Sequence, residues 1–217
     1  MIVARVPGVR AADLRLPPTL PGMRIGLFGG SFNPPHEGHL LVAETALRAL
    51  RLTHVWWMVT PGNPLKDHGD LAPLAERIAA SRALVRDPRI VVTAFEAGFD
   101  VRYSADTVRI AVERGQGARF VWIMGADSMA GFHRWQDWRR IADTLPLAVV
   151  DRPGSTLAYL SSKLAIAYAR ARVDEEDAAS LADRRPPAWT FLHGPRSSLS
   201  STALREAATA AAASDGG

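Results

Sequence analysis

The sequence predicts an α/β protein whose mainly parallel sheet is covered by helices on both faces. Short β-branched or aromatic runs, typical of strands, alternate with runs of helical period along the 217 residues. This alternation is characteristic of parallel sheets. Polar clusters follow three of the strand runs directly, at residues 29–39, 60–66 and 125–138. Ligands of such sheets bind beyond the carboxyl ends of the strands, so the clusters predict one shared site.

The first strands and helices of the chain have clear sequence signals. An apolar strand is expected at 24–29, where it runs into a glycine pair, and leucine and alanine at helical spacing predict a helix at 38–50. The run HVWWMVT predicts a second strand at 54–60, and the turn-rich loop 61–66 follows it. A further helix is expected at 73–86, where an Asp-Pro pair closes it.

The middle of the chain continues the same alternation. A third strand is expected at 89–95 and a fourth at 119–124, where the run RFVWIM stops at a glycine. Between them, the helix predicted at 104–115 also ends at a glycine. Residues 126–142 are rich in aromatic side chains and are predicted to be irregular and helical.

The last third of the chain is less regular. Strands are expected at 145–150 and 188–192, and residues 156–171 between them are predicted to be helical. Residues 172–187 are charged and then proline-bearing, so we expect an exposed connection there. A last helix is predicted at 200–210.

One domain accounts for a chain of this length, which can bury a full core without disulfides or metals. We expect the domain to span residues 23–206. Residues 1–22 are expected to be a disordered extension, and residues 207–217 a frayed tail. Charged residues interrupt the extension, so it lacks the continuous apolar segment of a signal peptide.

The amino-acid composition excludes some kinds of functional site and disfavours some kinds of partner. The chain has no cysteine, which excludes a disulfide framework, a thiolate zinc site and a catalytic thiol, and which fits a cytoplasmic protein. No apolar run is long enough to span a bilayer, so we expect no membrane partner. The net charge is +4, but the arginines are scattered without a basic run, so we expect no nucleic-acid partner.

The cluster after the first strand has the pattern of a phosphate site. Gly29 and Gly30 let the backbone approach a ligand closely, and a helix start follows, where unpaired N–H groups favour an anion. His36 and His39 are three residues apart, so they can share one face of that helix. A metal pair is disfavoured because no third ligand is evident nearby, and helix-capping histidines are the other alternative.

A second anion site is predicted near the C-terminus. Ser200, Ser201 and Thr202 supply three hydroxyls at a helix start, and Arg205 follows one turn later. A simple serine cap with a surface arginine would explain this segment if it stood alone. The pairing with the histidine cluster favours a phosphate clamp made from both ends of the chain.

These two segments resemble known signatures. Residues 29–39, Gly-Gly-Ser-Phe-Asn-Pro-Pro-His-Glu-Gly-His, resemble the HxGH motif of the nucleotidyltransferase superfamily, and residues 199–205 resemble its second motif. Further segments at 61–66, 102–107, 125–138 and 151–154 resemble the bacterial nicotinate-nucleotide adenylyltransferases. The resemblance implies a Rossmann-like doubly wound fold and a single nucleotidyltransferase domain.

The resemblance also assigns roles to residues. It implies catalytic roles for His36, His39 and Arg205. The residues expected to bind ATP are Gly29, Gly30, Ser31, Phe32, His36, His39, Gly125, Asp127, Ser200, Ser201, Thr202 and Arg205.

The acceptor side is expected to involve four residues, and for Trp135 the alternative role is packing. Trp135 offers a flat face for stacking on a pyridine ring, whereas the tryptophans within strands are expected to be packing residues. Lys66 suits the phosphate of nicotinate mononucleotide, although it could be a solvated loop lysine. Tyr103 and Ser104 are expected to meet the nicotinate carboxylate.

On the ATP side, Asp127 suits a ribose hydroxyl, and the alternative is a helix N-cap.

The expected reaction is adenylyl transfer from ATP to nicotinate mononucleotide in NAD biosynthesis. Mg²⁺ is expected to bind mainly through the ATP phosphates, with no dedicated protein site. The alternatives are the same chemistry on nicotinamide mononucleotide, pantetheine phosphate or a cytidylyltransferase substrate, or a non-catalytic nucleotide or RNA binder on this fold. The sequence leaves open whether the chain forms a homo-oligomer.

Overall fold

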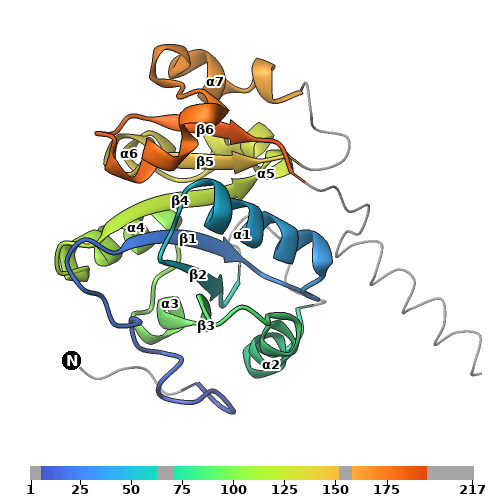
Figure 1. Ribbon diagram of the computed structural model, residues 1–217. Coiled ribbons are helices and arrows are strands. Elements are labelled where there is room, and N and C mark those ends of the chain that lie inside the picture. The colour runs from blue at the N-terminus through green and yellow to red at the C-terminus, as the bar shows by residue number, and fades with distance from the viewer. Residues whose placement is uncertain (1–5, 63–70, 152–157, 195–217) are drawn as a thin grey trace, which may run out of the picture.

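The computed structural model describes residues 6–62, 71–151 and 158–194 (Figure 1). Six parallel strands in these ranges form one sheet, in the order β3-β2-β1-β4-β5-β6. This is the strand order of the doubly wound nucleotide-binding fold, so the predicted fold class is confirmed. The strands are β1 (Arg24–Gly30), β2 (His54–Val59), β3 (Ile90–Thr93), β4 (Arg119–Gly125), β5 (Leu147–Val150) and β6 (Trp189–Leu192).

Helices fill the connections between the strands. Each strand-to-strand crossover in the described ranges carries at least one α- or 3₁₀-helix, as parallel pairing requires. The α-helices are α1 (Glu37–Ala49), α2 (Leu74–Leu84), α3 (Phe95–Gly98), α4 (Ser104–Arg114), α5 (Ala126–Gly131), α6 (Trp138–Thr144) and α7 (Lys163–Ala167). The 3₁₀-helices are η1 (Phe132–Arg134), η2 (Ala158–Ser161), η3 (Ala169–Ala171) and η4 (Glu175–Asp183).

The sheet separates two apolar cores. Alternate side chains of each strand point to opposite faces, so Trp56 and Trp122 enter one core while the adjacent Trp57 and Val121 enter the other. Helices α4, α5, α6 and α7 cover the first face, and α1, α2 and η4 cover the second (Figure 1). The strand tryptophans are buried, as expected for packing residues.

Residues 156–171, predicted to be helical, are interrupted within their described part. They form η2, α7 and η3 instead of one helix. Ser162 is the N-cap of α7, and its hydroxyl accepts a hydrogen bond from the Ala165 N–H at 3.1 Å. A serine side chain that caps a new helix start competes with continuation of the helix before it, which explains the break.

The prediction of an exposed connection at 172–187 is wrong for η4. Ala178, Leu181 and Ala182 are buried against the sheet, at a spacing that gives one apolar stripe. Asp183 also accepts hydrogen bonds from Arg24, at 2.5 Å, and from Arg119. Because this segment contains many charged residues, its short apolar stripe is hard to recognise from the sequence.

The N-terminal extension also differs from expectation over residues 6–22. Leu14 is 2% exposed, and the main-chain carbonyl of Asp13 accepts the N–H of Ala94 at 2.8 Å, just beyond β3. Gly98 makes this close contact feasible, because a Cβ there would lie 2.0 Å from the carbonyl oxygen of Leu14. The segment therefore packs along the outer edge of the sheet.

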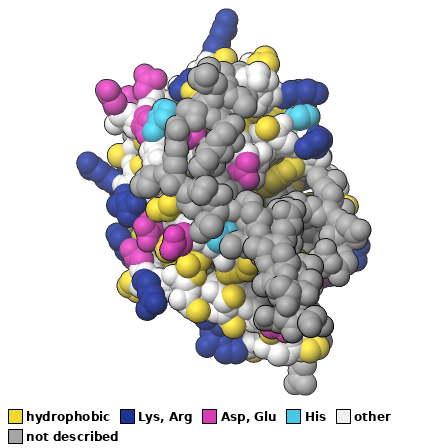
Figure 2. Space-filling model, turned by 90° about the vertical axis from the view of Figure 1, so that its right-hand side faces the viewer, with side chains coloured by type: hydrophobic (Ala, Val, Ile, Leu, Met, Phe, Trp, Pro, Cys, Tyr) yellow, Lys and Arg dark blue, Asp and Glu magenta, His cyan; other side chains and the backbone are white. Residues whose placement is uncertain are grey.

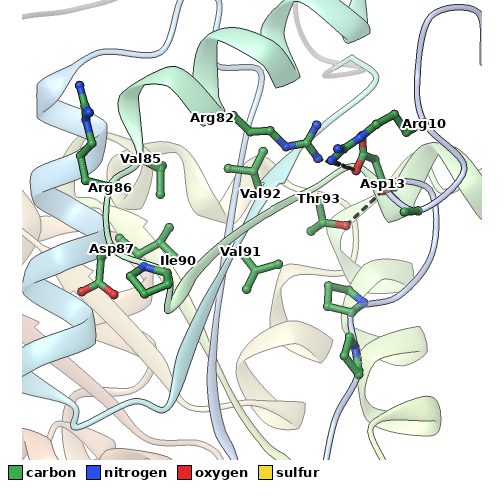
Figure 3. Close-up of a pocket in the computed structure, with 14 residues that line it drawn as sticks. Arg10, Asp13, Arg82, Val85, Arg86, Asp87, Ile90, Val91, Val92 and Thr93 are labelled. Atoms are coloured by element: carbon green, nitrogen blue, oxygen red, sulfur yellow. Dashed lines mark hydrogen bonds and ion pairs between the residues drawn. The ribbon is translucent and has the colours of Figure 1, made fainter.

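A pocket of about 450 Å³ lies between this segment and β3 (Figure 3). Its walls include Arg10, Arg82, Val91 and Val92. Both arginines donate to the carboxylate of Asp13, whose single negative charge balances one of their two positive charges. The pocket flanks β3, two strands away from β1, and not the carboxyl ends of the central strands.

Candidate active site

The strand order reverses between β1 and β4, and this fixes where a ligand can bind. The connection after β1 leads to β2 on one side, and the connection after β4 leads to β5 on the other. The two connections therefore diverge and leave a crevice at the carboxyl ends of the central strands. The predicted clusters at 29–39 and 125–138 follow these two strands directly. Figure 2 looks onto this end, where basic side chains lie around the periphery of the visible face.

The histidine pair stands at the start of α1. His36 is the N-cap residue, with an extended backbone, and the Nδ1 atom of His39 accepts the His36 N–H at 3.3 Å. The two ring centroids are 3.8 Å apart. His36 is only 4% exposed, whereas His39 is partly exposed. The strand, glycine turn and helix start predicted from the sequence are all present.

The capping hydrogen bond uses the Nδ1 atom of His39. Its Nδ1 accepts the backbone hydrogen bond, so a neutral ring carries its proton on Nε2. An Nε2–H group can donate to a phosphate oxygen while Nδ1 keeps the helix start in place. The helix-capping interpretation therefore describes part of the geometry and does not compete with a phosphate role.

The Phe32 side chain packs against the His39 ring. Its ring is 2% exposed, stacks on Trp57 at 4.4 Å between centroids and meets the His39 ring edge-on at 5.0 Å. The backbone of Phe32 has φ +46°, a conformation that costs roughly 1–3 kcal/mol for a non-glycine residue. Because the ring is buried, Phe32 can meet a ligand only through its backbone.

Glycine is needed just before this turn. A Cβ on Gly30 would lie 3.0 Å from the nearest atom of the Phe32 ring, so a larger residue would press on the aromatic support. The sequence pattern Gly-Gly-Ser-Phe thus has a packing reason as well as the predicted one of close ligand approach.

Gly125 and Asp127 mark the second connection. Gly125 is buried at the end of β4 and is the N-cap of α5, and Asp127 is exposed in the first turn. Asp127 is therefore not the helix N-cap, which was the alternative role. An exposed carboxylate at the crevice end of β4 has the right chemistry to accept a hydrogen bond from a sugar hydroxyl.

Trp135 is distinct among the six tryptophans, all of which lie in the described ranges. The other five are buried, including Trp138, whereas Trp135 is half-buried. Its ring meets Trp122 edge-on at 6.1 Å and Phe132 at 5.3 Å. These contacts hold the indole in place and leave part of it accessible.

Tyr103 and Ser104 form the start of α4. Tyr103 is the extended N-cap and is 37% exposed, and its carbonyl accepts the N–H groups of Asp106 and Thr107. The first N–H groups of a helix have no partner within the helix and attract carboxylates. This helix start fits the predicted contact with a nicotinate carboxylate.

Two buried charged residues were missed by sequence reasoning. Arg77 is 3% exposed and Glu96 is 6% exposed, and both lie beside the predicted loops. Arg77 shares the buried face of α2 with Ile78 and Ser81. An arginine at a core-facing helical position was the signal that could have found it.

Five predicted site residues lie outside the described residues. They are Lys66, Ser200, Ser201, Thr202 and Arg205. The Asp-Arg-Pro-Gly turn is described only as far as Asp151. Within the described ranges there is no group of three or more His, Cys, Asp or Glu side chains that could hold a metal ion. No helix in these ranges is long and apolar enough to cross a membrane.

Comparison with known proteins identifies the family. A family model described as cytidylyltransferase-like matches residues 27–207. A probable nicotinate-nucleotide adenylyltransferase of Rhizobium meliloti is 66% identical over 185 residues, which cover 85% of this chain and 98% of that protein. The chain belongs to the nicotinate-nucleotide adenylyltransferase family.

Other members of the nicotinate-nucleotide adenylyltransferase family are similarly close. Proteins of the same printed name from Brucella abortus and Methylorubrum extorquens are 62% and 64% identical, over 85% and 84% of this chain and 95% and 99% of their own length. A solved Plasmodium falciparum nicotinic acid mononucleotide adenylyltransferase, complexed with NaAD, matches with a TM-score of 0.64 at 15% identity. The match covers 85% of this chain and 83% of that chain, and it supports the fold.

Glu96 predicts a specific pH dependence of stability. Burial raises the pKa of Glu96 to about 7, against the opposing hydrogen bond from the Thr107 hydroxyl at 2.5 Å. The folded protein therefore keeps a proton that the unfolded chain releases near its ordinary value of 4.5. The contribution of Glu96 to the free energy of unfolding is greatest below pH 4.5, falls as the pH rises to about 7, and stays constant above pH 7.

Glu96→Gln removes that dependence. The variant should match the wild type near pH 4 and become more stable than it toward pH 8, by a few kcal/mol at most. Urea unfolding at pH 4 to 8 measures the difference, and the exposed Glu113→Gln in α4 is the control, with a difference that stays constant. A Glu96→Gln curve parallel to the wild type would show that the pKa of Glu96 is the same in the folded and the unfolded protein.

Proposed function

We propose that this protein transfers the adenylyl group of ATP to nicotinate mononucleotide. A phosphate oxygen of the mononucleotide attacks the α-phosphorus, the bond from that phosphorus to the bridging oxygen breaks, and pyrophosphate leaves. The product is nicotinate adenine dinucleotide. The observation that carries the proposal is the histidine pair at the start of α1, at the strand-order reversal, in a chain 66% identical to a protein named for this activity.

The ATP triphosphate is proposed to lie over the start of α1. The backbones of Gly29, Gly30, Ser31 and Phe32 would face it, and His39 would donate from Nε2 to the transferring phosphate. Ser200, Ser201, Thr202 and Arg205 are proposed to complete the clamp from the C-terminal segment. Gly125 and Asp127 would hold the ribose, as expected for groups that follow β4 across the crevice.

The acceptor is proposed to lie between the start of α4 and Trp135. The indole would stack on the pyridine ring, and the Tyr103–Ser104 backbone would meet the carboxylate. Lys66 is proposed to contact the acceptor phosphate as a point charge. Nucleotide substrates also fit the Plasmodium falciparum structures, which are named as complexes with APC and with NaAD.

The chain needs no general base for this reaction. The attacking phosphate oxygen is already anionic at neutral pH, so catalysis rests on positioning and on stabilising the charge that develops on the phosphates. The proposed Nε2–H of His39 and the backbone N–H groups serve that purpose. His36, almost fully buried, is proposed to act mainly by holding the His39 ring through their contact.

Magnesium is proposed to enter as part of the substrate, MgATP. Mg²⁺ is commonly held by substrate phosphates together with one or two protein carboxylates and several waters. When bound, the ion neutralises phosphate charge. The protein residues bind and orient the nucleotide around it.

An acceptor panel tests the function directly. Purified protein with MgATP should release pyrophosphate rapidly with nicotinate mononucleotide, and at least tenfold more slowly with nicotinamide mononucleotide or pantetheine phosphate. The reason is that only nicotinate offers a carboxylate to the start of α4. Faster turnover of either alternative acceptor would contradict the assignment, and no turnover of any of them would favour a nucleotide-binding role without catalysis.

His39→Ala should lower kcat by about 100-fold or more, the usual loss when one donor to a developing oxyanion is removed. Pyrophosphate release at saturating substrates measures it. His54→Ala is the matched control, because His54 begins β2 at the opposite end of the sheet. Near-normal turnover of a folded His39→Ala protein would exclude the phosphate role.

Trp135→Ala should raise the KM for nicotinate mononucleotide about tenfold, the value of one stacking contact of roughly 1.4 kcal/mol. The KM for ATP should change little. Trp135→Phe keeps a flat ring and should restore most of the affinity. Equal changes in both KM values would mean that Trp135 serves only to pack against Trp122 and Phe132.

A further inference from the structure

Arg77 makes an unusual set of contacts for a buried arginine. Its guanidinium donates to four main-chain carbonyls: Nη1 to Ser31 and Thr60, each at 2.7 Å, Nε to Ala72 at 2.8 Å, and Nη2 to Pro61 at 3.3 Å. These carbonyls come from the loop after β1, the loop after β2 and the segment before α2. One side chain on a rigid helix therefore ties three separate backbone segments together.

The arrangement depends on the shape of the guanidinium. Its five N–H donors lie in one plane, and contacts to four carbonyls in different directions use most of them. A lysine ammonium has three donors around one point and cannot reproduce the fork. Among the described residues Arg77 has no carboxylate partner, and burial lowers its pKa, but an arginine keeps its charge in proteins.

The bonds fix the direction of two peptide groups. In a trans peptide the C=O and the following N–H point in opposite directions. The Ser31 carbonyl is held toward Arg77, so the Phe32 N–H points away from it. The Pro61 carbonyl is held in the same way, so the Gly62 N–H also points away. Phe32 is the last of the four residues whose backbones are proposed to face the triphosphate, and Gly62 belongs to the loop proposed to contact the acceptor.

Two more hydrogen bonds join the same segments. The N–H of Ala72 donates to the Asn33 side chain at 3.2 Å, and the N–H of Thr60 donates to the Gly30 carbonyl at 3.0 Å. The two loops are thus linked at their bases, with Arg77 at the centre. The buried positive charge also lies behind a turn proposed to receive a highly charged anion.

We propose that Arg77 is a positioning residue that sets the ATP loop and the acceptor loop in one relative arrangement. It acts through the main chain at Ser31, Thr60 and Pro61 and does not itself contact substrate. The inference rests on the proposed function, because it takes the loops after β1 and β2 to hold the two substrates. It adds to that function a single residue on which both substrate sites depend.

Arg77→Lys tests the proposal, with Arg82→Lys as the matched control. Arg82 lies in the same helix, but it pairs with Asp13 at the sheet edge and not with either loop. Arg77→Lys should raise the KM for both ATP and nicotinate mononucleotide at least tenfold and lower kcat at least tenfold, per folded molecule. Arg82→Lys should lower the melting temperature without changing either KM.

Chemical rescue gives a second, independent readout. Arg77→Ala leaves space for a guanidinium ion, and guanidinium chloride at tens of millimolar, well below denaturing levels, should restore turnover severalfold. Potassium or methylammonium chloride at the same concentration should not. Calorimetric titration with MgATP alone should show weaker binding in Arg77→Lys than in the wild type.

The outcomes separate this inference from the proposed function. A wild-type protein that neither binds MgATP nor releases pyrophosphate would reject the proposed function itself. The positioning role would be overturned if the wild type is active and the Arg77 variants lose only thermal stability, with both KM values and kcat unchanged. Variants that fail to fold and are not rescued by guanidinium would likewise reduce Arg77 to a structural residue. A rise in the KM for ATP alone would contradict a link between the two loops.

Discussion

The parallel pairing of β1 with β4 is the constraint on which the rest of this structure depends. It places two strands from distant parts of the chain side by side, with their connections leaving in opposite directions. The resulting crevice brings the start of α1 and the start of α5 to one end of the sheet. Every group proposed to meet ATP within the described residues lies at the carboxyl end of one of these two strands or follows it.

Around that crevice the chain uses buried groups to hold partly exposed ones. Phe32 and Trp57 form an aromatic support beneath His39, and His36 packs against its ring. Phe132 and Trp122 do the same for Trp135. Such supports leave few rotamers open to the functional side chain, which lowers the entropy lost when a ligand binds.

Three buried ionisable residues show how the fold accommodates polar groups. Arg77 satisfies its donors with carbonyls, Glu96 accepts a hydroxyl, and Asp13 pairs with Arg10 and Arg82. In each case, hydrogen bonds offset the cost of removing a polar or charged group from water. Asp13 is buried, which shows that residues 6–22 belong to the packed structure. Burial raises the pKa of Asp13, but the two arginines outweigh that effect and lower it.

The sequence by itself determined the fold class, the order of strands and helices, and the motif residues, because periodicity and glycine turns are local signals. It also supported the choice of Trp135 over the strand tryptophans. Only the tertiary structure decided that η4 packs on the sheet, that residues 6–22 cover its edge, and that Arg77 joins two loops. Those features depend on contacts between segments far apart in the chain, such as Ser31 with Arg77, and no local pattern encodes which carbonyl a buried side chain will meet.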